Sequence, residues 1–270
     1  VFVSESIFVG SAKDKKVVLI EVSPENFGVY KVENQNQLIC SNHFQSAAYA
    51  NDERNQKHIL ESHSQYRYER MEELLQENPK VTPERAVAIL RNKEGLEDKK
   101  IGYGNEKALN QLLAHHGIVF KPEELLVWVS SNPYQLGEFV AYDLHTIFKE
   151  KAKNLGPRQL ANNNLVIAKD TFQFTDAFAN YEAYRTLKRT IEKAIHKEEK
   201  VELQLFKELQ KKNPNHWESY YISGKYLYEQ GYFRAALAEF NSAKTKEITT
   251  LIDQENIEEY IRKIKRKIDV

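Results

Sequence analysis

The sequence LICSNHF, residues 38–44, closes a short apolar run with a hydroxyl, a carboxamide, an imidazole and an aromatic ring. Further along, residues 64–70 read SQYRYER. A side-chain amide fixed at the end of a strand is well suited to donate a hydrogen bond to a developing oxyanion. An arginine in the second segment could hold a substrate carboxylate or orient a nucleophile. The two segments therefore make Asn42 and an arginine of the second segment, Arg67 or Arg70, candidate functional residues.

The composition of the chain is that of a soluble globular protein. Of its 270 residues, 41% are hydrophobic and 29% are charged, which separates it from disordered sequences. Lys plus Arg and Asp plus Glu both number 39, so no strong field attracts nucleic acid or an anionic membrane. No apolar run approaches the ~20 residues of a transmembrane helix. We therefore expect neither a nucleic-acid partner nor a membrane span.

The cysteine and histidine content argues against a metal site. A single cysteine, Cys40, rules out an intrachain disulfide and a cysteine-based zinc site. His115 and His116 are adjacent, and no carboxylate accompanies them at a ligand-like spacing. Cys40 is predicted to be a small buried hydrophobe rather than a nucleophile, because it lies inside a predicted strand. The odd offset to His43 would turn the two side chains to opposite faces of that strand.

Hydrophobic periodicity divides the chain into two parts. The first part alternates like short antiparallel strands with two helices between them, at 67–76 and 83–90. Its strands are predicted at 6–9, 17–22, 28–32, 37–40, 117–120, 125–130 and 138–144. The second part has a helical period, with helices predicted at 178–195, 199–212, 217–229, 232–244 and 255–268. We therefore predict an α+β protein with one domain at 1–150 and an all-α extension at 151–270.

One segment of the helical part, residues 220–243, resembles a single tetratricopeptide repeat. Small residues at Gly224, Ala236 and Ala243 would let two antiparallel helices approach closely, with Phe240 filling the space between them. Such helices could form a groove for a protein partner, or they could be an appendage that covers a face of the first domain. The appendage is favoured because solenoids need several repeats to bury a core.

Several motifs of the first part together resemble a known family. They are VLIEVSP at 18–24, SNHF at 41–44, the arginine-bearing segment at 64–70, and AHHGIVF at 114–120 with WVS at 128–130. The chain is similar here, over roughly residues 1–145, to the acyl-coenzyme A:6-aminopenicillanic acid acyltransferase family, peptidase family C45. This is a branch of the N-terminal-nucleophile hydrolases, related to choloylglycine hydrolases and acid ceramidase.

The resemblance implies an αββα sandwich of two antiparallel sheets. In that fold a cysteine at a chain N-terminus attacks a linear acyl amide or an acyl-CoA-like thioester, with its own α-amine as general base and no cofactor. Asn42 would then donate to the oxyanion, and Arg67 would lie near the nucleophile. Arg70 would replace Arg67 if the register were shifted by a helical turn. The resemblance also makes His43, Ser64 and Arg70 candidate substrate-binding residues.

The sequence departs from the family pattern at the nucleophile. Val1 has no nucleophilic side chain, so the catalytic cysteine is expected in an upstream segment absent from this chain. We therefore expect the C-terminal portion of an amidohydrolase or acyltransferase, inactive by itself. The alternative is a non-catalytic interaction module, in which the sheets are a relic scaffold and the helical tail binds a protein partner.

Overall fold

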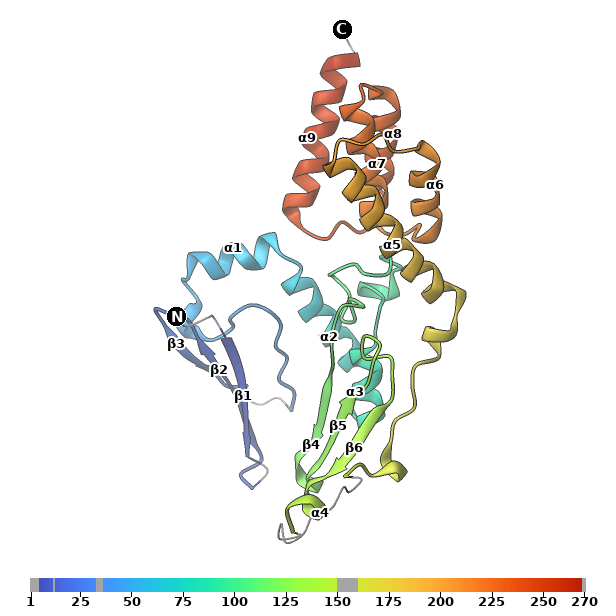
Figure 1. The fold of residues 1–270 in the computed structure, drawn as a ribbon. Helices are drawn as coiled ribbons and strands as arrows, with labels where there is room; N and C mark the ends of the chain where they lie inside the picture. The colour runs from blue at the N-terminus through green and yellow to red at the C-terminus, as the bar shows by residue number, and fades with distance from the viewer. Residues whose placement is uncertain (1–4, 12, 33–35, 150–159, 269–270) are drawn as a thin grey trace. The chain divides into compact units, whose positions relative to one another are not determined.

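The computed structural model describes residues 5–11, 13–32, 36–149 and 160–268 and shows an α+β protein (Figure 1). Its contacts divide the chain into two compact units. The first unit contains Val1–Ile89, Gly117–Ser130 and Phe139–Ile167, and the second contains Leu90–His116, Ser131–Glu138 and Ala168–Val270. The predicted boundary between residues 150 and 151 lies outside the described residues, so the division into 1–150 and 151–270 stays a prediction.

The first sheet of the first unit is an antiparallel meander. It consists of β1 (Glu5–Ser11), β2 (Lys16–Val22) and β3 (Phe27–Tyr30), in that order across the sheet. Leu19 and Glu21 are two residues apart on β2, so they share a face, and both are fully buried. Gly28 lies opposite Glu21, and a Cβ atom there would come within 2.0 Å of the Ser46 hydroxyl. The glycine thus lets the loop that contains Ser46 pack directly against β3.

The predicted strand at 37–40 is wrong. The described residues of the segment 36–46 form an irregular loop, which is followed by a 3-10 turn (η1, Ala47–Tyr49) and by α1 (Glu53–Glu61). The loop takes its hydrogen bonds from side chains instead of a neighbouring strand; for example, the Gln45 amide donates to the Ile39 carbonyl at 2.8 Å. Helix α1 was not predicted, because its sequence ERNQKHILE has too few apolar residues to show a helical period.

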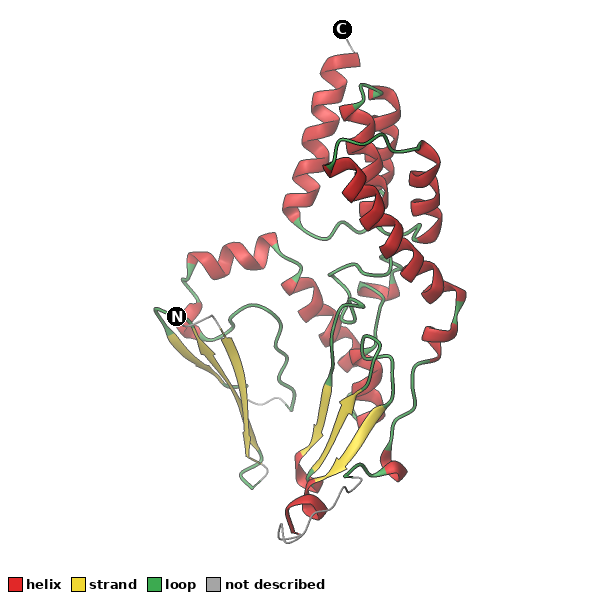
Figure 2. Cartoon of the chain, in the orientation of Figure 1, coloured by secondary structure: helices red, strands yellow, loops and turns green. Residues whose placement is uncertain are grey.

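The rest of the first unit combines helices with a second sheet (Figure 2). Helices α2 (Ser64–Glu77) and α3 (Pro83–Leu90) precede β4 (Ile118–Lys121), β5 (Leu126–Ser130) and β6 (Phe139–Asp143), and α4 (Leu144–Lys149) follows them. The sheet is again antiparallel, in the order β4-β5-β6. Val119, Trp128 and Ala141 lie side by side across the three strands and are all buried. The predicted strands and helices of this region are confirmed to within a few residues.

The second unit is mainly helical. After a 3-10 turn (η5, Thr171–Phe174) it contains α5 (Asp176–His196), α6 (Leu203–Lys212), α7 (Trp217–Glu229), α8 (Phe233–Lys244) and α9 (Leu251–Ile268), and consecutive helices pack together. Ala236 and Ala243 are fully buried, and a Cβ atom on Gly224 would come within 3.1 Å of the Phe240 ring. The predicted close approach of two helices at these small residues is confirmed. The likeness to a tetratricopeptide repeat stays a prediction.

A loop from the first half of the sequence belongs to this helical unit. The Asn213 side chain holds the backbone of Tyr103 from both sides, donating to its carbonyl at 2.7 Å and accepting from its N–H at 3.2 Å. The Asn105 amide donates to the Glu247 carbonyl at 2.9 Å, and Lys107 pairs with the Glu247 carboxylate at 2.6 Å. The loops that precede α7 and α9 therefore hold residues 103–107 through hydrogen bonds and an ion pair.

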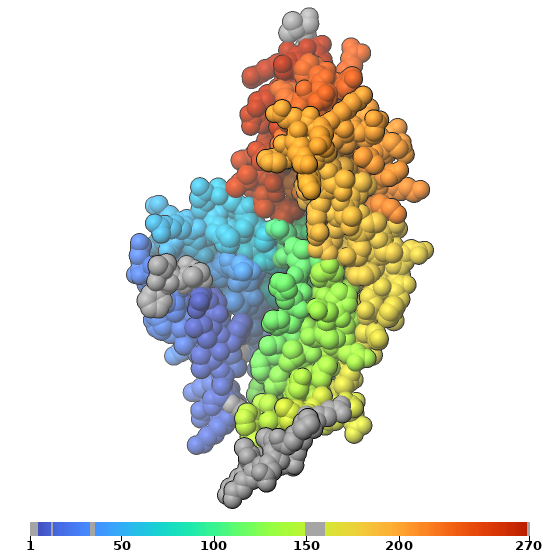
Figure 3. All heavy atoms as spheres, in the orientation of Figure 1, coloured from blue at the N-terminus to red at the C-terminus, as the bar shows by residue number. Residues whose placement is uncertain are grey.

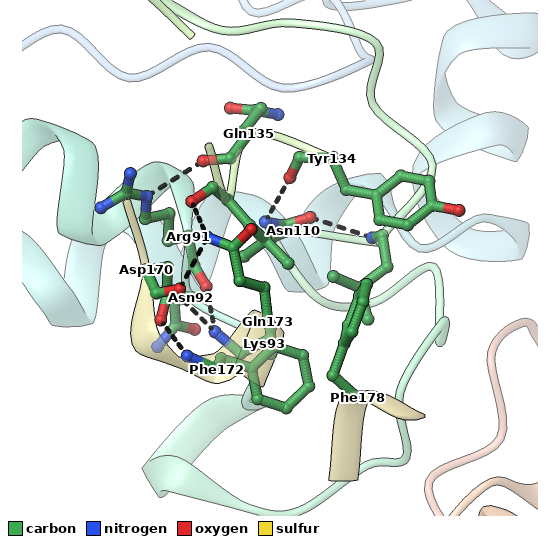
Figure 4. A network of polar contacts seen from close by, with 12 residues as sticks. Arg91, Asn92, Lys93, Asn110, Tyr134, Gln135, Asp170, Phe172, Gln173 and Phe178 are labelled. Atoms are coloured by element: carbon green, nitrogen blue, oxygen red, sulfur yellow. Dashed lines mark hydrogen bonds and ion pairs between the residues drawn. The ribbon is translucent and has the colours of Figure 1, made fainter. Parts of the chain in front are cut away.

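A second loop, Ser131–Glu138, is tied to the same unit by Arg91 (Figure 4). The Arg91 guanidinium donates to the carbonyl of Gln135 at 3.0 Å, of Gly137 at 2.7 Å and of Ala168 at 3.0 Å. Burial lowers the pKa of Arg91, and Asp170 opposes that effect. One side chain thus satisfies three carbonyls on two segments that are distant in the sequence.

Candidate functional site

The loop with the SNHF motif is held on one side by a buried carboxylate. Glu21 on β2 is fully buried, and its two oxygens accept hydrogen bonds from the backbone N–H groups of Gln45, at 2.7 Å, and Ser46, at 2.8 Å. Hydrogen bonds to an ionised acceptor are stronger than those between neutral groups. The carboxyl end of the loop is therefore fixed to the first sheet.

Asn55 on α1 fixes the middle of the same loop. Its side chain accepts from the Phe44 N–H at 2.9 Å and donates to the Phe44 carbonyl at 3.0 Å. The Phe44 ring stacks on Tyr49, with ring centroids 4.1 Å apart. The residues just before Phe44 thus have a defined place between β2 and α1. Neither Glu21 nor Asn55 was identified as part of the site from the sequence, although Glu21 lies in one of the motifs that carry the family resemblance.

The structure brings the two predicted catalytic residues together. Arg67, on the first turns of α2, donates a hydrogen bond to Oδ1 of Asn42 and also contacts Nδ1 of His63. A guanidinium has only donors, so the oxygen of the Asn42 amide must be the atom that faces Arg67. Within the described ranges, no residue forms a hydrogen bond with the Nδ2 group. The Asn42 side chain is exposed, so this N–H₂ group is open to a ligand.

His43 and Ser64 also meet. Nδ1 of His43 lies 2.8 Å from the Ser64 hydroxyl, which in turn lies 3.1 Å from the hydroxyl of Ser41. Ser64 is fully buried and is the first residue of α2, with His63 at the N-cap position. Ser64 is therefore not the N-cap of α2, and its hydroxyl is directed to the SNHF loop instead. Ser41 was not singled out from the sequence.

Its surroundings keep His43 neutral. Burial lowers the pKa of His43 below its ordinary value of 6.5, and the nearby His58 and Arg67 lower it further, while Glu21 acts in the opposite direction. A neutral imidazole keeps one nitrogen with a lone pair, so His43 can accept a proton near neutral pH.

The SNHF loop faces a cavity of about 580 Å³ in the first unit. Its walls come from β1, the turn after β2, the SNHF loop and α1, and they include Cys40, Ser41, Asn42 and His43. The volume lies within the range of sites for small molecules. The prediction that Cys40 and His43 point to opposite sides is wrong, since both line this cavity; the alternation argument fails because the segment is not a strand.

Cys40 has the properties of a structural thiol. Burial raises its pKa, and a hydrogen bond with Ser6 offsets only part of that effect. The Sγ atom lies 3.3 Å from the Ser41 carbonyl oxygen, which is an acceptor and cannot take a proton from the thiol as a base would. The thiolate is the nucleophilic form, so a raised pKa disfavours attack by Cys40 at neutral pH.

Arg70 is not brought to this cavity. It is fully buried and pairs with Glu73 on the same helix at 2.8 Å, and it does not line the cavity. In the described parts of the chain, no group of three His, Cys, Asp or Glu side chains is placed to hold a metal ion. None of the helices described here has both the length and the hydrophobicity needed to cross a lipid bilayer.

Replacing Glu21 by alanine should loosen the site. The change leaves the N–H groups of Gln45 and Ser46 buried without an acceptor, which is expected to cost about 2–4 kcal/mol of unfolding free energy. Chemical denaturation measures this directly. Glu53→Ala, at an exposed carboxylate on α1, should change the stability by no more than about 0.5 kcal/mol. Equal losses for the two variants would show that Glu21 does not hold the loop.

The comparison with known families agrees with the motifs. Residues 4–132 match the family model described as Acyl-coenzyme A:6-aminopenicillanic acid acyl-transferase. This confirms the resemblance for that part of the chain, which contains Asn42, His43, Ser64 and Arg67 and the whole cavity. No curated protein and no solved structure gives a significant match.

Proposed function

We propose, on the basis of the family match over residues 4–132, that the cavity at the SNHF loop is an acyl-transfer site of the N-terminal-nucleophile type. The substrate would be a linear acyl amide or an acyl-CoA-like thioester. Its acyl carbon would be attacked by a cysteine thiol, and the acyl group would then pass to water or to another acceptor.

The observation that carries this proposal is the hydrogen bond from Arg67 to Asn42. Because Arg67 occupies Oδ1, the amide can only present its Nδ2 donor to the cavity. A positive charge on the oxygen side also polarises the amide and strengthens that donor. A preorganised donor of this kind stabilises the oxyanion of a tetrahedral intermediate. In this scheme Asn42 is the catalytic residue, and Arg67 positions it.

We further propose that the nucleophile comes from a polypeptide segment outside the described residues, as an N-terminal cysteine with its α-amine as base. The weak reactivity expected of Cys40 supports this. So does β1, which is an edge strand next to the cavity. Its side chains Ile7, Phe8 and Val9 are 45–55% exposed. The strand belongs to the blue part of the chain in Figure 3. Another strand of an αββα sandwich pairing with the backbone of β1 would extend this sheet and bring its own residues to the cavity.

Among the residues predicted to bind substrate, His43 and Ser64 are better supported than Arg70. His43 lines the cavity, and Ser64 is one hydrogen bond behind it. Arg70 would need a change of position to reach a substrate. The helical unit is better explained as internal support than as a partner-binding module, because its interhelical loops already bind residues 103–107.

A small-molecule nucleophile tests the proposal. The protein is mixed with p-nitroanilides of linear fatty acids and with cysteine amide, which supplies a thiol beside a free amine, and p-nitroaniline release is followed by absorbance. We expect release above the rate without protein, and a much lower rate with N-acetylcysteine amide, whose amine is blocked. Equal rates with and without protein, over a range of acyl lengths, would refute the proposed site.

A further inference from the structure

The two ring nitrogens of His43 have different surroundings. Nδ1 is turned toward the buried Ser64 hydroxyl at 2.8 Å. Within the described residues Nε2 forms no hydrogen bond, and the ring lines the cavity beside Asn42. The imidazole is therefore held from the protein side through one nitrogen, which leaves the other for a ligand.

The hydroxyl groups of Ser64 and Ser41 determine which ring nitrogen of His43 has the proton. Ser64 donates its single hydroxyl proton to Ser41 at 3.1 Å. With the Ser64 proton directed to Ser41, Nδ1 is the donor toward Ser64, because a hydroxyl has only one proton to give. In that tautomer Nε2 has the lone pair. A buried serine thus prepares the imidazole as a proton acceptor on its cavity side.

We infer that His43 is the general base for the acyl acceptor, and that Ser64 and Ser41 are the residues that position it. This inference rests on the proposed function and names the group that would activate the second substrate. The acceptor, water or an amine, attacks the acyl–enzyme carbonyl while its proton passes to Nε2. The tetrahedral intermediate then expels the enzyme thiolate, which takes the proton back from the imidazolium, so the free thiol is regenerated.

The charged groups around His43 are compatible with this role. Glu21 on β2, His58 on α1 and Arg67 on α2 act on its charge, and the Tyr68 ring on α2 lies 5.8 Å from the imidazole. The cavity wall adds Glu5, Glu25, Asp52 and Arg54. Burial, His58 and Arg67 outweigh Glu21, so the imidazole stays neutral above pH 6.5 and ready to accept a proton.

NMR tests the tautomer without any assay of activity. In protein labelled with ¹⁵N at histidine, the His43 signals should show Nδ1 protonated and Nε2 free, with a midpoint of titration below 6.5. Ser64→Ala and, separately, Ser41→Ala should reduce the excess of that tautomer; Ser41 is only partly buried, which favours folding of its variant. A wild-type protein with the proton on Nε2 would overturn the inference whatever its activity.

Two substrates separate the two steps. With cysteine amide as nucleophile, p-nitroaniline release reports acylation of the thiol, and hydrolysis of a fatty-acyl thioester of N-acetylcysteamine, which stands in for the acyl–enzyme, reports transfer to water. His43→Gln should keep the release of p-nitroaniline and slow thioester hydrolysis by about 10²–10⁴-fold, and the loss of thioester hydrolysis that protonation of His43 is expected to cause in the wild type at acidic pH should disappear. His145→Gln, at an exposed position, should behave as the wild type. Normal thioester hydrolysis in His43→Gln would refute the base, while no release of p-nitroaniline by any of the proteins would refute the proposed function, and the inference with it.

Discussion

Replacing Asn42 by alanine is expected to lower the rate of p-nitroaniline release by about 10²–10³-fold, the usual loss when one oxyanion donor is removed. The loss should fall on kcat, because the donor is needed when charge develops on the carbonyl oxygen rather than when substrate binds. The fold should be unaffected, since the side chain is exposed and its known partner is a single guanidinium.

Asn42→Asp makes the test sharper. Aspartate keeps an oxygen for Arg67 but has no N–H, so it preserves the contact and removes the donor. A loss as large as that of the alanine variant would assign the effect to Nδ2. Asn51→Ala, at an exposed asparagine nearby in the sequence, serves as the matched control. Full activity in both Asn42 variants would exclude the oxyanion role.

Sequence periodicity was sufficient for most of the regular elements, but not for α1 or for the loop that forms the site. The other main strands and helices were predictable because local apolar patterns of period 2 and 3.6 determine them. The loop at 36–46 was not, because its hydrogen bonds come from Glu21 and Asn55, whose roles depend on tertiary contacts. Cys40 therefore shares a cavity with His43 against the alternation rule.

The pairing of Asn42 with Arg67 was expected only from the family resemblance. No local rule joins residues 25 positions apart, and the bond forms because α2 starts against the loop. Periodicity also could not predict which segments of the chain form the second unit. Tyr103 is held by Asn213 across 110 residues, so a boundary drawn where the helical pattern begins could not include this loop with the helices.

Gly102→Ala should produce a large loss of stability in the second unit. Gly102 has a φ of +85°, a region that L residues occupy at a cost of about 1–2 kcal/mol. An added Cβ would also come within 2.6 Å of the backbone N and Cα of His216, which cannot move aside as a flexible side chain would. Overpacking of this kind costs about 1–3 kcal/mol more. We therefore expect a total loss of about 3 kcal/mol.

Gly231→Ala separates the two causes of that loss. Gly231 has a φ of +79°, but nothing lies within 4 Å of where its Cβ would be. This variant should show only the backbone cost, about 1–2 kcal/mol. Thermal unfolding, with hydrogen exchange at the amide of Tyr103, compares the two variants. Because Tyr103 is next to Gly102 and is held by Asn213, its amide should exchange faster only in Gly102→Ala. Equal destabilisation, with Tyr103 protected in both, would mean that residues 103–107 do not depend on close packing against the loop before α7.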